Sequence, residues 1–230
     1  MQVMAPSSSV TVVWFRPDRV SWWIGALFGI GSACFAIASF ASQWASAPRP
    51  AIGVTFFVGS VFFTVAAFLQ LRTSQTRTDK VAALVQFVGT LFFNVSTFAG
   101  MQRGLDARQT DLRVWTPDVF GSACFLVSSA LSYVAVRRPS AAWRIAGLNL
   151  LGSVFFGIAA LAALIEPSTS EPVSAAIGNA GTTAGALCFF AGAFMLIPQA
   201  AAAAAVDPVK EDDDVDPAKR RSPGRAHEWR

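Results

Sequence analysis

Charged residues gather in short segments of the chain and leave long apolar runs between them. Each run has the roughly 18 to 20 residues that a helix needs to cross the hydrocarbon core of a bilayer. A soluble protein with the same 53% of hydrophobic residues would show charges every few residues on its exposed helix faces. The pattern therefore predicts an all-α integral membrane bundle of six transmembrane helices. The runs without Asp, Glu, Lys or Arg are residues 20–48, 50–71, 81–102, 119–136, 145–165 and 172–206.

We expect three segments in this chain. Residues 1–19 form a cytoplasmic N-terminal segment and residues 20–199 form the transmembrane domain. Residues 200–230 form a cytoplasmic tail, in which we expect residues 200–205 to prolong the last helix and the remainder to be disordered, because that remainder mixes acidic and basic residues with several prolines. The segment 102–117 carries alternating Arg and Asp and is expected to be a solvated connector. The predicted spans are residues 20–41, 51–71, 81–100, 118–136, 144–165 and 173–197.

A short unit, in which phenylalanine follows a glycine by four positions, occurs once in each apolar run. The unit GSACF begins at Gly31 and Gly121, and GSVFF begins at Gly59 and Gly152. Units at about thirty-residue intervals, built from a small residue and an aromatic, indicate similar helices in close contact. We call the first residues of the six units the repeat glycines: Gly31, Gly59, Gly89, Gly121, Gly152 and Gly185.

The spacing of the units leaves the internal symmetry open. The repeat glycines pair at separations of 90, 93 and 96 residues, as if three helices had been copied once. Consecutive halves of three helices enter a membrane in opposite senses, so this pairing predicts two three-helix repeats of inverted topology, as in many secondary transporters. Serial duplication of a two-helix hairpin, or chance similarity among membrane helices, would explain the same motifs.

We expect the small residues to lie at helix–helix contacts, because glycine lets two backbones approach closely. The spacing GxxxG adds Gly25 with Gly29, and Gly181 with Gly185, to this set. The predicted packing positions are therefore the six repeat glycines together with Gly25, Gly29 and Gly181.

Side-chain amides are the conspicuous polar groups inside the runs. Three positions before the repeat glycine, on the same helix face, the last four helices carry a polar residue. Hydrogen bonding between helices is the favoured role of these groups. The alternative is a polar path for a small neutral or anionic solute. The amides are Gln86, Asn94, Asn149 and Asn179, and the polar residues before the glycines are Gln86, Asp118, Asn149 and Thr182.

The runs lack the groups that intramembrane chemistry requires. Asp118 follows Pro117, and we expect its carboxylate to cap the N-terminus of the fourth helix. The sole histidine, His227, lies in the tail, and the three cysteines are separated by whole helices, so we expect no metal, no cofactor and no disulfide. An intramembrane serine hydrolase would need a His or Lys base. We therefore expect that the protein is not an enzyme.

Basic residues lie mainly on one side of the predicted membrane. Fourteen of the 18 Lys and Arg residues fall in the N-terminal segment, the second and fourth loops and the tail. Because basic residues in short loops are retained on the cytoplasmic side, we expect a multi-pass cell-membrane protein with both termini in the cytoplasm. The net charge of +4 then reports topology and requires no nucleic-acid partner. The lipid bilayer is the expected partner, while homo-oligomerisation and a partner protein stay open.

Several of these motifs resemble a known family. RPDRVSWWI from Arg16, GTLFFNVSTF from Gly89 and LNLLGSVFFG from Leu148, with the unit at Gly31, are similar to the YrhK-like family and to multi-pass membrane proteins of actinobacteria. The resemblance covers all six runs and implies helical hairpins with glycine and phenylalanine at such positions, in a bacterial inner membrane. It implies no activity and no catalytic residue.

The sequence therefore favours a structural or regulatory membrane protein without chemistry of its own. The evidence for this role is that the runs carry no charge and that no sizeable soluble domain accompanies them. The alternative is a small-solute channel or uncoupled transporter, whose polar path would be lined by amides of the third and fifth helices.

Overall fold

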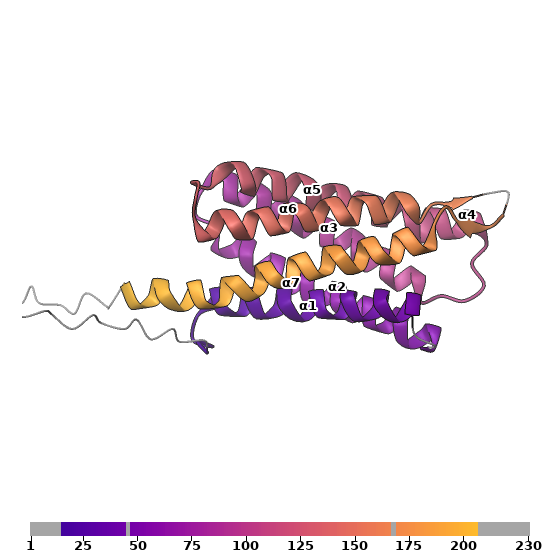
Figure 1. Ribbon diagram of the computed structural model, residues 1–230, viewed down its shortest axis with the longest axis horizontal. Helices are drawn as coiled ribbons and strands as arrows, with labels where there is room; N and C mark the ends of the chain where they lie inside the picture. Colours follow the sequence, from indigo (N-terminus) through magenta and orange to yellow (C-terminus); the bar gives the residue numbers. More distant parts are fainter. Residues whose placement is uncertain (1–14, 45–46, 167–168, 207–230) are drawn as a thin grey trace, which may run out of the picture.

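The computed structural model of the protein describes residues 15–44, 47–166 and 169–206, which are almost entirely helical (Figure 1). Six spans in this part of the chain, of 22 to 29 residues each, are long and apolar enough to cross a membrane, which confirms the predicted class. Two short strands, β1 (Ile165–Glu166) and β2 (Glu171–Pro172), pair antiparallel. The helices are α1 (Val20–Trp44), α2 (Arg49–Thr73), α3 (Arg77–Gly100), α4 (Ala107–Thr110), the π-helix η1 (Asp111–Trp115), α5 (Thr116–Ala135), α6 (Ala141–Ala162) and α7 (Ala175–Val206).

The fourth span begins earlier than predicted. Continuous helix runs from Ala107 through η1 into α5, so the prediction of a connector over residues 102–117 is wrong for most of its length. The cause is a capping box: the Asp106 carboxylate accepts a hydrogen bond from the Gln109 backbone N–H at 2.7 Å, and the Gln109 side chain accepts from the Asp106 N–H at 3.3 Å. Pro117 lacks an N–H, and the wider π turn immediately before it adjusts the hydrogen-bond ladder.

The last helix continues past the predicted span, as expected for residues 200–205. Residues 200–206 of the expected tail continue α7, which contains Pro198. The rest of the predicted tail, residues 207–230, lies outside the described residues, as do residues 1–14 of the N-terminal segment.

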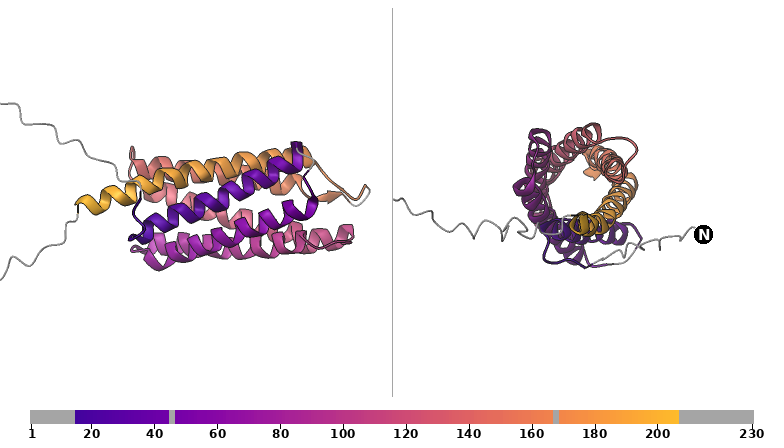
Figure 2. Two further views of the ribbon diagram at one scale, coloured as in Figure 1. Left: turned by 90° about the horizontal axis from the view of Figure 1, so that it is seen from below. Right: turned by 90° about the vertical axis from the view of Figure 1, so that its left-hand side faces the viewer.

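The six spans form a closed ring around one axis, with neighbours antiparallel (Figure 2). Each helix contacts the one before it and the one after it in the chain, and α7 closes the ring against α1. The start of α1 and the end of α7 lie at one end of the ring, and α4 lies with the two strands at the other (Figure 1). We call these the terminal end and the distal end.

Glycine brings the two helices of each hairpin into backbone contact. The hairpins are α1–α2, α3–α5 and α6–α7, and we call α1, α3 and α6 the first helices and α2, α5 and α7 the second helices. A Cβ atom added to Gly59 would lie only 3.1 Å from the carbonyl oxygen of Gly31, so no side chain fits there. The same approach is made by the pairs Gly89–Gly121 and Gly152–Gly185.

The remaining predicted packing glycines also face neighbouring helices. A Cβ at Gly25 would lie 3.2 Å from the carbonyl oxygen of Ala193 on α7, and one at Gly181 would lie 3.1 Å from the Cβ of Ala159 on α6. Gly29 has the loosest contact, at 3.9 Å from the Cβ of Ala193. These positions place α7 close to both of its neighbours.

Hydroxyl groups join each hairpin to the next. One hydrogen bond between two side-chain hydroxyls crosses each of the three interfaces between hairpins. Such bonds contribute about 0.6 kcal/mol each in membrane proteins. Contacts between repeat glycines and bonds between hydroxyls therefore alternate around the ring of helices. The pairs are Ser60–Thr97 at 3.0 Å, Ser129–Ser153 at 2.8 Å and Ser39–Thr183 at 2.8 Å.

The order of helices around the ring bears on the internal symmetry. Turning a three-helix half upside down reverses the sense in which it runs around the axis. The contacts instead place all six spans in chain order around the ring, with one sense of rotation throughout. This order, together with the glycine contacts within each hairpin, favours three serial hairpins over two inverted halves.

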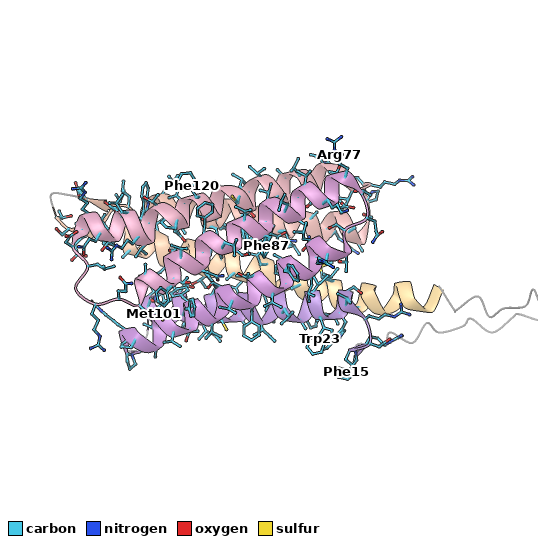
Figure 3. All side chains as sticks on the ribbon, turned by 180° about the vertical axis from the view of Figure 1, so that it is seen from behind. Phe15, Trp23, Arg77, Phe87, Met101 and Phe120 are labelled. Carbon is cyan, nitrogen blue, oxygen red and sulfur yellow. The ribbon has the colours of Figure 1, made fainter. Side chains whose placement is uncertain are left out.

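Large apolar side chains cover the outside of the ring. Figure 3 shows Trp23 and Phe120 directed away from the bundle, and these side chains are 45% and 53% exposed. Extensive exposed apolar surface marks a face that contacts other apolar material, here the acyl chains of a membrane.

Candidate functional site

Six phenylalanine rings fill the centre of the ring of helices, one from the last position of each repeated unit. They form two triads: first-helix ring centroids lie 5.9 to 6.2 Å apart, and second-helix centroids lie 5.6 to 6.4 Å apart. Within each hairpin, two rings lie 5.1 to 5.3 Å apart, a favourable distance for aromatic pairs. All six are at most 6% exposed. We call them the phenylalanine plug: Phe35, Phe93 and Phe156 in one triad, and Phe63, Phe125 and Phe189 in the other.

Positions that face the axis recur every seven residues in each span. Counted from the repeat glycine, they are the third residue before it, the plug residue four after it and the residue eleven after it. Seven residues are close to two helical turns, so these three positions share one face. In the first helices, the third residue before the glycine lines a cavity at the terminal end, and the residue eleven after it lines a cavity at the distal end. In the second helices, the third residue before the glycine lines the distal cavity, and the residue eleven after it lines the terminal one.

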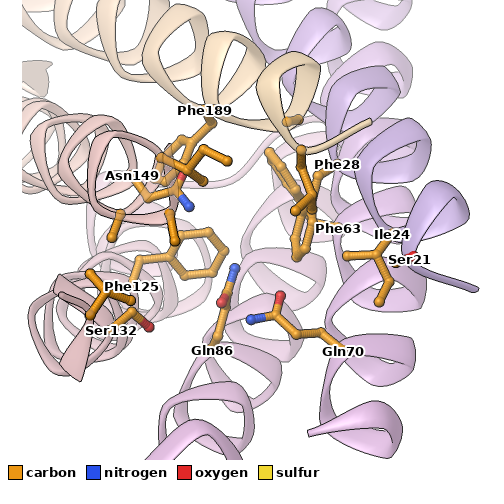
Figure 4. A pocket seen from close by; sticks show the side chains of 17 residues that line it. Ser21, Ile24, Phe28, Phe63, Gln70, Gln86, Phe125, Ser132, Asn149 and Phe189 are labelled. Atoms are coloured by element: carbon orange, nitrogen blue, oxygen red, sulfur yellow. The ribbon is translucent and has the colours of Figure 1, made fainter. Parts of the chain in front are cut away.

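The cavity at the terminal end, the terminal cavity, has a volume of about 320 Å³. Figure 4 shows the amides of Gln70, Gln86 and Asn149 directed into the space between the helices, with plug rings beside them. The Gln86 side-chain oxygen accepts a weak hydrogen bond from Ser128 at 3.4 Å. Among the residues that the structure describes, no charged side chain lines this cavity, so its polar lining consists of amides and hydroxyls.

The cavity at the opposite end, the distal cavity, has a volume of about 520 Å³. It differs from the terminal cavity because two charged side chains, Asp118 and Arg49, line it. Its aromatic lining is Phe35, Phe56 and Trp115, and its other polar side chains are Ser42, Ser96, Thr97, Thr110, Asn179 and Thr182.

The structure assigns Asp118 a place that differs from the predicted one. The N-terminal N–H groups of this helix lie at Asp106 to Gln109, about three turns earlier, so the expected helix cap is wrong. Asp118 lies inside the continuous helix and lines the distal cavity. Its carboxylate forms no hydrogen bond or ion pair with any residue in the described ranges.

The four amides predicted for a polar path are divided between different places. Gln86 and Asn149 line the terminal cavity, and Asn179 lines the distal cavity, where its Nδ2 donates to the Gln43 side-chain oxygen at 3.2 Å. Asn94 lines neither cavity: its Nδ2 donates to the Thr64 hydroxyl at 2.9 Å across α2 and α3, and its Oδ1 is buried without a partner. Asn94 therefore holds two helices together.

Sequence reasoning missed several polar lining residues, among them Gln70 and Ser132. Both lie eleven positions after a repeat glycine, on second helices, and line the terminal cavity. The seven-residue period would have identified them, because one further step of seven residues after the plug phenylalanine leads to these positions.

Within the described ranges, no group of three or more His, Cys, Asp or Glu side chains could hold a metal ion. Cys34, Cys124 and Cys188 are free thiols at matching places. Each packs against a repeat glycine of the partner helix in its hairpin.

The fold and the apolar spans define the class: a multi-pass helical membrane protein with six spans in a ring. No family model, no curated protein and no solved structure matches the chain. The resemblance to the YrhK-like family therefore stays a prediction.

Proposed function

We propose that the protein is a closed conduit for small polar solutes, a channel or uncoupled transporter. The observation that carries this proposal is that two cavities lie on the axis of the ring, one on each side of the phenylalanine plug. The cavities are the vestibules and the plug is the gate. This function was the alternative in the sequence analysis, where a structural or regulatory role was favoured.

The dimensions of the helices support this arrangement. Gln86 precedes Phe93 by seven residues on α3, and Asp118 precedes Phe125 by seven on α5. Seven residues of helix span about 10 Å, so Gln86 and Asp118 each lie about 10 Å from the plug along the axis, on opposite sides of it. The solute would then meet only two layers of aromatic rings. Hydrophobic constrictions of this kind gate by excluding water, and displacing a few rings would join the vestibules.

The lining of the vestibules supports a small polar solute and passive transport. Amides and hydroxyls both donate and accept hydrogen bonds, so they replace the water around such a solute. The plug consists of six phenylalanines and offers no titratable group that could relay a proton from one cavity to the other.

The packing of the plug favours a second candidate function. Rings that are at most 6% exposed and in mutual contact also make a stable core, as expected of a structural or regulatory membrane protein without its own chemistry. The two functions differ in what happens when rings are removed.

For the orientation, we infer that the terminal end faces the cytoplasm of a bacterial cell. The loops and helix ends at this end carry Arg72, Arg77, Arg137, Arg138 and Arg144, and short basic connections of this kind are retained in the cytoplasm. A ring of three hairpins is also compatible with the helical hairpins that the YrhK-like resemblance implies.

The test is solute flux into proteoliposomes, measured as the rate of swelling in a gradient of urea. The double variant Phe93→Ala with Phe125→Ala removes one ring from each triad and should raise urea permeability above that of the wild type. The matched control is Phe98→Ala with Phe120→Ala, two rings that are 54% and 53% exposed on the lipid face. A folded plug variant with wild-type permeability would favour the structural role.

A further inference from the structure

We propose that the distal cavity binds a small organic ammonium ion, for which Asp118 supplies the counter-charge. This inference deepens the proposed function, on which it rests, because it names the class of solute that enters from the distal end.

The first argument is the state of the Asp118 carboxylate. It lies within a membrane-crossing helix, lines the cavity and has no hydrogen-bond or ion-pair partner in the residues that the structure describes. An ionised carboxylate inside a membrane span is costly unless it meets a positive charge, and such residues mark ion pathways. The residues at the equivalent positions of the other second helices are Phe56 and Thr182, so one of the three hairpins has a charged residue at this position.

The second argument is the aromatic lining of the same cavity. Phe35, Phe56 and Trp115 line it, and aromatic faces attract alkylammonium ions through cation–π interactions. These rings are held in place: the Trp115 Nε1–H donates to the Ala160 carbonyl oxygen at 2.8 Å, and the Phe35 and Phe56 rings meet edge to face at 5.3 Å. The cavity therefore combines one carboxylate with three fixed aromatic rings.

Charge and size favour an organic cation over a metal ion. A single carboxylate balances a single positive charge, whereas calcium sites use several oxygen ligands, commonly from more than one carboxylate. A volume of about 520 Å³ is far larger than a bare ion, and the rings that form part of its wall offer no oxygen or nitrogen ligand.

Arg49 also lines the distal cavity, but it lies nearer the mouth. Arg49 precedes Phe63 by 14 residues, whereas Asp118 precedes Phe125 by seven, and both phenylalanines belong to the same triad. The difference of seven residues places Arg49 about 10 Å farther from the plug. Arg49 is exposed and forms no ion pair with Asp118 among the described residues, so it is not a direct partner of the carboxylate.

The experiment is calorimetric titration of tetramethylammonium chloride into the full-length protein in lipid nanodiscs. We expect saturable binding by the wild type, an affinity lower by about tenfold or more in Asp118→Asn, and little change in Asp118→Glu, which keeps the charge. The matched control is Asn149→Ala in the terminal cavity, which should bind like the wild type. Trp115→Leu keeps the carboxylate and should also weaken binding, which preserves the test if Asp118→Asn fails to fold.

The proposal would be overturned if the wild type showed no saturable binding, or if the wild type and Asp118→Asn bound with equal affinity. Potassium chloride that displaces the probe at equal concentration would overturn the role of the aromatic rings. Because the titration uses the closed protein, it is independent of the urea flux. Binding of tetramethylammonium without urea flux would contradict the proposed conduit and support the ammonium site. Urea flux without binding would support the conduit and contradict the ammonium site.

Discussion

The two cavities are built by the same positions of the same repeated unit, yet their chemistry differs. The terminal cavity presents Gln86 and Asn149 at the third position before the repeat glycine, and the distal cavity presents Asp118 and Thr182 at that position. One cavity is therefore lined by neutral amides, and the other holds a carboxylate that has no partner among the described residues.

The difference arises within two of the three hairpins. The first hairpin supplies phenylalanine to both cavities, as Phe28 and Phe56. The second and third hairpins each supply a different residue at each end. The comparison shows that the glycine contacts and the plug phenylalanines fix the same arrangement of helices at both ends. The chemistry of each cavity is set by the few axis-facing residues that differ between the ends.

The largest expected effect is a difference in thiol labelling between the two cavities. In a variant with Cys34, Cys124 and Cys188 changed to Ala, single cysteines replace Asn149, Thr182 or Asn94. A membrane-impermeant thiol reagent should react with Asn149→Cys from one face of the membrane only and with Thr182→Cys from the other face only, because the plug separates the cavities. Asn94→Cys should stay unreacted, since this position lies between two helices. Reaction of both cavity positions from one face would mean that the cavities are already joined.

Removing a plug ring breaks the wall between the two cavities. Phe93 is 1% exposed and contacts rings of both triads, so Phe93→Ala should lower the free energy of unfolding by about 3 to 5 kcal/mol. The measurement is reversible unfolding in mixed detergent micelles. Phe120→Ala, on the lipid face, should cost about 1 kcal/mol or less. Equal losses at the two positions would contradict a packed plug.

A glycine substitution should affect both cavities together, because the glycine contacts set the spacing of the hairpins. A Cβ at Gly89 would lie 2.8 Å from the Cβ of Cys124 and 3.1 Å from the carbonyl oxygen of Gly121. We expect Gly89→Ala to destabilise the fold by about 1 to 3 kcal/mol in the same unfolding assay. Gly157→Ala is the matched control, since no neighbouring atom lies within 4 Å of the added Cβ. Similar stability of the two variants would argue against backbone contact at Gly89.

The smallest effect is expected at the hydroxyl bonds between hairpins. Ser129→Ala removes the bond to Ser153, which keeps its own bond to the Asn149 carbonyl oxygen, so the loss should be about 0.6 kcal/mol. Ser132→Ala, a change inside the terminal cavity, should leave stability nearly unchanged. A loss above about 2 kcal/mol at Ser129 would mean that the hairpins depend on this bond more than on their packing.

Much of this architecture could be predicted from sequence because the bilayer imposes strong patterns on it. The charge-free runs gave the six spans, and the unit that begins at Gly31 contained the plug residue, Phe35. The offset of three residues before the glycine also selected Gln86, Asp118, Asn149 and Thr182, which all line cavities.

Other features depend on how each helix is rotated about its own axis, which a list of polar residues does not contain. Asn94 and Asn149 look alike in sequence, but Asn94 faces a neighbouring helix and Asn149 faces the central axis. Asp118 was misread because Pro117 suggested a helix start, while the capping box at Asp106 went unused. The spacing of motifs also left the hairpin and inverted arrangements open, because spacing does not report the order of helices around a ring.

The division of each triad among all three hairpins has a consequence for biosynthesis. After the first two hairpins have left the translocon, each triad holds only two of its three rings, and the growing protein is an open trough that lipid can enter. We therefore expect the insertion of α6 and α7 to be the step that expels lipid from the centre. A nascent chain that stops at Ala135 would have two of its three glycine contacts and no sealed interior.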